Sequence, residues 1–358
     1  MAKKPRADKQ WRKRQQKLKR LDRHPPRLGH ESMLQIPAFR DAAAVLTERL
    51  RTAAGALRRQ VSEQDFEHPL VDSMLRDRYA LVRQLHGWSH EDAALEAQQF
   101  CTHLAAAVNH AVAGKKTFWV SPELAQALHR TNLDVPGDVL RLPFDACAFV
   151  FNDGPTLEIA QTLIDRHTTR RAPYRTLTVY AFPSRDDVAA GFEFVFLADA
   201  YDDEWPYMIS RSVLTDGKRN LDEILDSHPE GSTDELFWEP EMADLLRLVV
   251  NAVLYTTSVE YREEWREPAP RGLTPKHATL SGDGVYYLPG RIRIGAEAPD
   301  GSPRPPGGTG TTIIKRFWVR GHWRRPNPSW QDQRVRWIAP YLKGPEVAAI
   351  VEREYELG

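Results

Sequence analysis

A run of residues near the C-terminus alternates cationic with apolar side chains, and this pattern constrains the fold more than any other stretch. From 316 to 324 the even positions hold Arg, Trp, Arg, His and Arg, whereas the odd positions hold Phe, Val, Gly and Trp. Because successive side chains of a β-strand point to opposite faces, the run predicts a strand with one cationic and one apolar face. The alternation returns at 334–337, after the turn-forming sequence PNPSW, and the two runs predict a β-hairpin. We call residues 313–344 the basic ribbon.

The alternation separates residues with a structural role from residues that make contacts. The residues expected in the core are Phe317, Val319, Trp323, Val335 and Trp337. The residues expected to bind nucleic acid are Arg316, Trp318, Arg320, His322, Arg324, Arg334, Arg336 and Lys343. Exposed aromatic rings stack on unpaired bases, which makes Trp318 and Trp330 candidates for stacking. Gly321 predicts a bulge or a close approach of two backbones, and a bulge would move His322 to the other face.

The charges are segregated along the chain, although the formal net charge is zero. Residues 1–27 contain twelve Lys or Arg and two Asp, and residues 315–343 contain eight Lys or Arg and one Asp. The intervening residues 28–314 contain 28 basic and 42 acidic residues. Basic ends that flank an acidic body favour contact with a polyanion through those ends. The alternative is that the basic ends fold back onto the acidic body.

The periodicities of the remaining chain predict an α+β fold. Amphipathic patterns with three- and four-residue steps predict an N-terminal helical layer at 37–61, 69–86 and 89–114. Runs rich in aromatic and β-branched residues predict a mainly antiparallel sheet, with strands at 117–120, 140–151, 176–182, 192–198 and 207–213. Further helices are predicted from Ser121-Pro122, at 220–227 and at 239–259. The last of these is a long apolar helix that we expect in the core against the sheet.

Composition divides the chain into five segments. They are a disordered basic tail at 1–28, a helical region at 29–114, an α+β core at 115–266, a Pro/Gly-rich connection at 267–312, and the basic ribbon with a C-terminal helix at 313–358. The connection contains a short strand at 285–294 and then the sequence APDGSPRPPGGTG. Such a flexible connection predicts that the basic ribbon is placed semi-independently of the core.

Several classes of protein do not fit this sequence. The most apolar run, 245–255, is shorter than the ~20 residues of a membrane span and is interrupted by Arg247 and Asn251, and the N-terminus lacks the apolar region of a secretory signal. Cys101 and Cys147 lack a C-x-x-C spacing, so we expect buried, reduced thiols in a cytoplasmic protein. A cluster of acids is typical of a solvated turn rather than a metal site; it contains Asp199, Asp202, Asp203 and Glu204. We therefore expect no metal and no cofactor.

His322 leaves catalysis open as an alternative to binding. Histidine is the side chain that ordinarily exchanges a proton near neutral pH, and His322 lies between Arg320 and Arg324 on the predicted cationic face. It would assist attack by an RNA 2′-hydroxyl while the arginines hold the phosphate. A general acid would also be needed, and the candidates are His277 or a tyrosine. The catalytic hypothesis is therefore a metal-independent ribonuclease centred on His322.

Two short sequences of the basic ribbon, VRGHWRR at 319–325 and RVRW at 334–337, resemble a signature of the type V-A anti-CRISPR inhibitor family, which is encoded on mobile elements. Weaker likenesses lie at 140–151, 215–225, 245–255 and 273–277, so the resemblance extends in patches from about Leu133 to the C-terminus. Inhibitory members of that family recognise the N-terminal segment of the effector nuclease during its synthesis and lower its mRNA. The resemblance carries this role to the signature positions Arg320, Gly321, His322, Trp323, Arg334, Arg336 and Trp337.

The resemblance implies an RNA- or ribosome-associated regulator that recognises a nascent polypeptide and promotes loss of its mRNA. The acidic body would hold a basic peptide, while the tail and the basic ribbon dock on RNA phosphates. The expected partners are RNA or the ribosome and a nascent polypeptide, with no membrane. The alternatives are the ribonuclease and a DNA-binding protein of a mobile element, since basic β-ribbons also enter the grooves of DNA.

Overall fold

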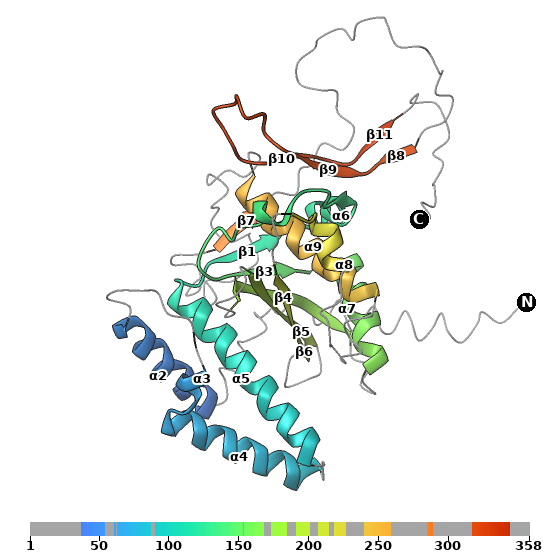
Figure 1. Cartoon of the computed structure of the whole chain (residues 1–358). Coiled ribbons are helices and arrows are strands. Elements are labelled where there is room, and N and C mark those ends of the chain that lie inside the picture. Colours follow the sequence, from blue (N-terminus) through green and yellow to red (C-terminus); the bar gives the residue numbers. More distant parts are fainter. Residues whose placement is uncertain are drawn as a thin grey trace, which may run out of the picture.

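The computed structural model describes the folded body and most of the basic ribbon (Figure 1). The described residues are 37–53, 61, 63–86, 90–152, 154–167, 173–184, 191–200, 207–214, 218–226, 240–258, 285–288 and 317–343. Helices and strands are both abundant in these stretches, and the predicted α+β class is confirmed. The predicted basic tail and C-terminal helix lie outside the described residues.

A six-stranded sheet forms the centre of the molecule (Figure 1). In spatial order its strands are β6 (Tyr207–Leu214), β5 (Gly191–Ala200), β4 (Tyr174–Pro183), β3 (Cys147–Phe151), β1 (Thr117–Val120) and β7 (Val285–Leu288). Neighbouring strands from β3 to β6 are antiparallel, whereas β1 runs parallel to both β3 and β7. The prediction of a mainly antiparallel sheet is confirmed, and one side of the sheet is parallel.

Helices cover both faces of the sheet. One face packs against α9 (Pro240–Thr257), together with α6 (Pro122–His129), α7 (Gly154–His167) and the short α8 (Leu221–Asp226), and this is the largest apolar cluster. The opposite face contacts α5 (His90–Val112), where Ala106 packs with Tyr180 and Val195. Most side chains of α9 are buried. The long apolar helix is therefore the core helix that its sequence predicts.

The N-terminal helices have an apolar core of their own. They are α2 (Pro37–Ala53), α3 (Glu63–Phe66), α4 (Pro69–His86) and α5, and their buried side chains include Phe39, Leu46, Val71, Phe100 and Leu104. The helical layer is thus present as expected. The apolar periodicity of 69–86 predicts Leu70 on the inward face of the helix, and this is wrong, because Leu70 is 54% exposed. It lies in the first turn of α4, where Val71 and Met74 take the inward positions.

Several elements were not expected from the sequence, among them α3, α7 and β11 (Tyr341–Lys343). In α7, Pro155 lies in the first turn, a position to which proline is well suited. The two-residue strand β2 (Thr131–Asn132) was not expected either and has no periodicity of its own. The strand predicted at 140–151 begins only at Cys147, and the residues before it form a short 3-10 helix (Gly137–Val139) and irregular structure.

Burial sets the protonation of several core groups. Burial lowers the pKa of His103 to about 3 and that of His110 to about 4, so both imidazoles are neutral at neutral pH. Burial raises the pKa of the half-buried Cys101 thiol to about 11 and raises that of the buried Cys147 thiol as well. Both cysteines are free thiols, as predicted, and Cys147 is buried as expected, whereas the expectation that Cys101 is buried is wrong. Within the described stretches, no helix has the length and apolar character needed to cross a membrane.

Candidate nucleic-acid interface

The basic ribbon consists of two aligned strand pairs. Strand β9 (Gly321–Arg324) pairs antiparallel with β10 (Arg336–Ile338), and β8 (Phe317–Val319) pairs antiparallel with β11 (Tyr341–Lys343). The predicted hairpin is therefore confirmed. Its loop turns at 327–330, where the Trp330 N–H donates to the Asn327 carbonyl over 2.8 Å. Figure 1 shows the hairpin lying next to α6 and α9.

The inner face of the hairpin belongs to the core of the protein. Trp323 and Trp337 face each other across β9 and β10 and are 5% and 7% exposed. Trp323 Nε1 donates to Asn251 Oδ1 over 2.7 Å, and Trp337 Nε1 donates to Thr131 Oγ1 over 3.1 Å. Val335 is also buried. These three residues therefore have the structural role that strand alternation predicts.

Asn251 of α9 connects this face to the rest of the core. Its side chain is completely buried, and besides accepting from Trp323 it donates from Nδ2 to the carbonyls of Leu128 and Thr131, over 3.1 Å and 3.0 Å. Both halves of the amide are thus hydrogen-bonded inside the protein, as a buried amide requires. The prediction that the ribbon is placed semi-independently is wrong for β9 and β10, because these bonds fix the hairpin on α9.

Gly321 marks a close approach of backbones and not a bulge. His322 follows Val319 by three residues and Tyr341 follows Ile338 by three, so the register passes through Gly321 without an inserted residue. A Cβ at Gly321 would lie 2.5 Å from Thr131 Oγ1 and 2.9 Å from Pro340 Cδ. Only glycine fits this contact, in which β9 also runs parallel to β2. Of the two expectations, the close approach is confirmed and the bulge is wrong.

The outer face of the hairpin exposes the predicted contact residues. Arg320, His322, Arg324 and Arg336 are all exposed, and the alternation with the buried tryptophans is unbroken. In the antiparallel register Arg324 lies directly opposite Arg336. Like charges in this position repel each other. The outer face therefore concentrates positive charge where an isolated hairpin would gain stability from opposite charges.

Trp330 in the hairpin loop lies against this arginine pair. The Cζ atoms of Arg324 and Arg336 are 5.3 Å and 5.6 Å from the centroid of the ring system, within the range of cation–π contacts. The Trp330 side chain is nevertheless 37% exposed. It is thus an exposed aromatic ring beside two guanidinium groups, on the cationic face.

Arg334 has a different environment from the other predicted contact residues. Its guanidinium forms an ion pair with Asp332, at 2.8 Å, and also donates from Nη1 to the Ser258 carbonyl over 3.2 Å. Hydrogen bonds from the Arg334 side chain and backbone lower the pKa of Asp332 to about 2. Arg334 therefore connects the hairpin loop to the end of α9, and its charge is partly neutralised.

Strand β2 adds polar residues that sequence reasoning missed. Asn132 is exposed and lies beside His322 in the parallel register, and its Oδ1 accepts from Arg320 Nη1 over 3.4 Å. The carbonyl of Arg130, whose side chain is exposed, accepts from the Gly321 N–H over 2.9 Å. Only pairing of segments nearly 190 residues apart brings these groups together. No local pattern in the sequence indicates it.

The remaining predicted residues are placed only in part. Trp318 lies in β8 and Lys343 in β11, but the orientation of their side chains is not described. Arg316 and the candidate acid His277 lie outside the described residues, as do three of the four clustered acids. The fourth acid, Asp199, is buried and forms an ion pair with Arg175. It is a structural residue of the β4–β5 pair.

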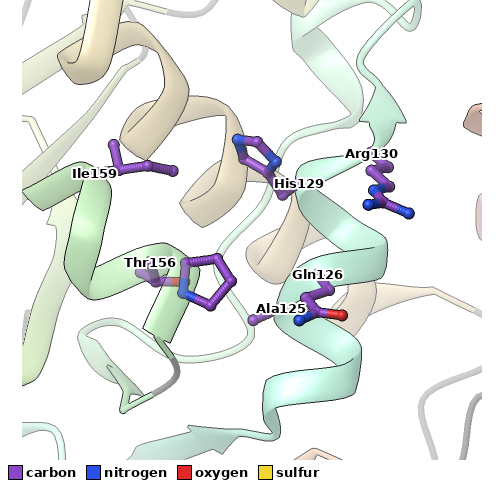
Figure 2. A pocket seen from close by; sticks show the side chains of 7 residues that line it. Ala125, Gln126, His129, Arg130, Thr156 and Ile159 are labelled. Atoms are coloured by element: carbon purple, nitrogen blue, oxygen red, sulfur yellow. The ribbon is translucent and has the colours of Figure 1, made fainter. Parts of the chain in front are cut away.

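A small pocket lies between α6 and α7, close to the chain segment that leads into β2 (Figure 2). Its volume is about 130 Å³, and it is lined by Ala125, Gln126, His129, Arg130, Pro155, Thr156 and Ile159. Figure 2 shows His129 on the side of α6 that faces Ile159, whereas Arg130 extends in the other direction. Pockets that enclose small molecules usually exceed ~300 Å³. We therefore assign the candidate interface to the outer face of the ribbon and not to this pocket.

Comparison with known proteins identifies the family. The sequence matches the AcrVA2-like family, described as the anti-CRISPR type V subtype A2 family, over residues 118–344. The chain belongs to this anti-CRISPR family. A search of curated protein sequences finds no significant match. Among solved structures, the chain is similar to a crystal structure of AcrVA2 with a TM-score of 0.45 and 13% identity, over 88% of this chain and 99% of the other.

The matched range defines which part of this anti-CRISPR family member carries the family sequence. It begins in β1 and ends just after β11, so it includes the sheet, α9 and the whole of the described ribbon. The helical layer of α2 to α5 lies outside it. The hairpin with its arginine pair is therefore a feature of the family region, as the signature in the sequence implies.

Proposed function

We propose that this anti-CRISPR family member is an RNA- or ribosome-associated regulator that recognises a nascent polypeptide and promotes loss of its mRNA. The observation that supports RNA contact is the direct opposition of Arg324 and Arg336 on an exposed face. Asp332 is the single acidic residue between 317 and 343, and it is bound to Arg334. A phosphate backbone would relieve the repulsion between the two arginines and release its own counterions.

The basic tail strengthens this proposal, and the acidic body suits the second partner. Twelve Lys or Arg in residues 1–27 add a second basic segment for the same polyanion. The intervening chain has 42 acidic against 28 basic residues, which favours a basic peptide over nucleic acid. Nascent-chain recognition itself rests on family membership, and the arginine pair supports only the RNA contact.

Ribosome binding is tested by sedimentation of the tagged protein with cell extract through a density gradient. We expect the protein to move with ribosomes at low salt and to dissociate as salt rises. The variant Arg324→Gln/Arg336→Gln should bind RNA more weakly, and the slope of log affinity against log salt should fall by about 0.7 for each phosphate of a single strand that the variant no longer neutralises. The matched control is Arg76→Gln, an exposed arginine of α4 outside the family range. If the protein stays free of ribosomes at every salt concentration and does not bind RNA, the proposal is wrong.

Loss of mRNA is tested with a reporter that begins with the coding segment for the N-terminus of a type V-A effector. We expect its mRNA to fall when the protein is present, and to be unaffected when the start codon is removed. Cleavage of purified RNA without ribosomes, abolished by His322→Ala, would instead favour the ribonuclease. Preference for duplex DNA over RNA in direct competition would favour the DNA-binding alternative.

A further inference from the structure

The hairpin loop holds Trp330 in a defined position outside the core. The side-chain amide of Gln333 donates to the carbonyls of Asn327 and Trp330, and Asn327 Oδ1 accepts from the N–H and hydroxyl of Ser329. Trp330 is absent from the apolar clusters of the described residues and is 37% exposed. A loop that only had to reverse the chain would not require a large aromatic ring at this exposed position. The loop therefore holds the Trp330 ring at the surface of the protein.

The ring lies beside the two opposed arginines of the outer face. The guanidinium groups of Arg324 and Arg336 both lie within 6 Å of the centroid of Trp330, although these two arginines repel each other. The contacts hold both guanidinium groups over the ring, and the Trp330 side chain is still 37% exposed. A ligand that stacks on the exposed part of Trp330 therefore lies close to two positive charges. Planar bases joined by phosphates have this combination of properties.

We propose that Trp330 is a stacking platform for an unpaired base, with Arg324 and Arg336 on the adjacent phosphates, so that the RNA bound by the ribbon is single-stranded. This inference rests on the proposed function and specifies its ligand. Every base has a π-face, so stacking is tolerant of sequence, as a contact with varied mRNA or with ribosomal RNA loops requires. In a duplex the bases are already stacked on one another and offer no face to the ring. Stacking therefore favours single-stranded RNA over a duplex, a preference that charge alone does not give.

The test compares Trp330→Ala with the unaltered chain on two probes of equal sequence. One is an unstructured RNA of about 12 nucleotides, a length suited to single-strand sites, and the other is the same strand annealed to its complement. We expect Trp330→Ala to lower single-strand affinity about tenfold, and to leave duplex affinity within about twofold. Trp330→Phe should retain most of the affinity, because a smaller ring still stacks. A 2-aminopurine base in the single strand should be quenched on binding, and this quenching should disappear in Trp330→Ala.

The controls separate this inference from the function on which it rests. Tyr341→Ala removes another aromatic side chain of the ribbon that is 37% exposed, and it should leave binding unchanged. The salt dependence of Trp330→Ala should equal that of the unaltered protein, whereas the arginine variants reduce it. If the arginine variants weaken RNA binding but Trp330→Ala does not, or weakens both probes equally, the stacking inference is wrong and the proposed function stands. If the unaltered protein binds neither probe, the proposed function fails first.

Discussion

The two faces of the basic ribbon have opposite relations to the rest of the protein. On the inner face, the indole N–H groups of Trp323 and Trp337 each have a hydrogen-bond partner in the body, at Asn251 and Thr131. On the outer face, Arg324 lies opposite Arg336, and the ring beside them is exposed. The inner face is part of the core. On the outer face the two guanidinium groups repel each other, and an external anion would reduce this repulsion. Like charges placed opposite each other on a strand pair that the core holds in position indicate a binding site more strongly than exposed charge alone.

The largest effect is expected when the buried side-chain amide of Asn251, which anchors the inner face, is removed. Asn251→Leu would leave the Trp323 indole N–H and the carbonyls of Leu128 and Thr131 without their side-chain partner. We expect the free energy of unfolding to fall by about 2–4 kcal/mol, because buried polar groups would lose their hydrogen bonds. Urea denaturation followed by tryptophan fluorescence measures it. Trp323→Phe should lower the free energy of unfolding by less than Asn251→Leu does. The double variant should lower it by less than the sum of the two single effects. Strict additivity would contradict the hydrogen bond.

The next effect concerns the contact between β9 and β2. Gly321→Ala would place a Cβ 2.5 Å from Thr131 Oγ1, a hydroxyl that also donates to the Ala127 carbonyl and accepts from Trp337. We expect a loss of about 1–3 kcal/mol in the free energy of unfolding, which is typical of overpacking. The matched control is Gly154→Ala, where a Cβ would meet nothing within 4 Å. Equal unfolding midpoints for the two variants would show that the close approach is not required.

Substitutions on the outer face should change binding without changing stability. For Arg324→Gln/Arg336→Gln we expect a free energy of unfolding within about 0.5 kcal/mol of the unaltered chain, since exposed side chains away from the core contribute little. Removal of the repulsion between the opposed guanidinium groups favours a slight gain. Thermal unfolding beside an RNA-binding titration measures both quantities. A large loss of stability would mean that the arginines hold the hairpin together, and would remove the distinction between the faces.

The sequence predicted the two faces but not what anchors one of them. Alternation is local, so it placed Trp323 in the core and His322 outside from residues 316–324 alone. In the sequence Asn251 is no more than an interruption of an apolar run, although its amide is the link between α9 and the hairpin. Its partners lie more than 70 residues away in either direction, and hydrophobic periodicity carries no information about such pairs. For the same reason Asn132 was missed, since strand β2 exists only through its pairing with β9.

The smallest effect concerns Asp332, the acid of the hairpin loop that is bound to Arg334. Hydrogen bonds from Arg334 hold the pKa of Asp332 at about 2, below the ordinary 3.8, because they stabilise the ionised carboxylate in the folded protein. The native state thus binds fewer protons than the unfolded chain between these two values, so the stabilisation from this pair is complete above about pH 4 and is lost as the pH falls toward 2.

Because Asp332 is exposed, the change in stability should be slight. The pKa of Asp332 is therefore best measured directly, by NMR titration of its carboxyl carbon. A midpoint near 2 is expected, and Arg334→Gln should return it toward 3.8. A midpoint of 3.8 in the unaltered protein would mean that Arg334 is not bound to Asp332 and belongs with the binding arginines of the outer face.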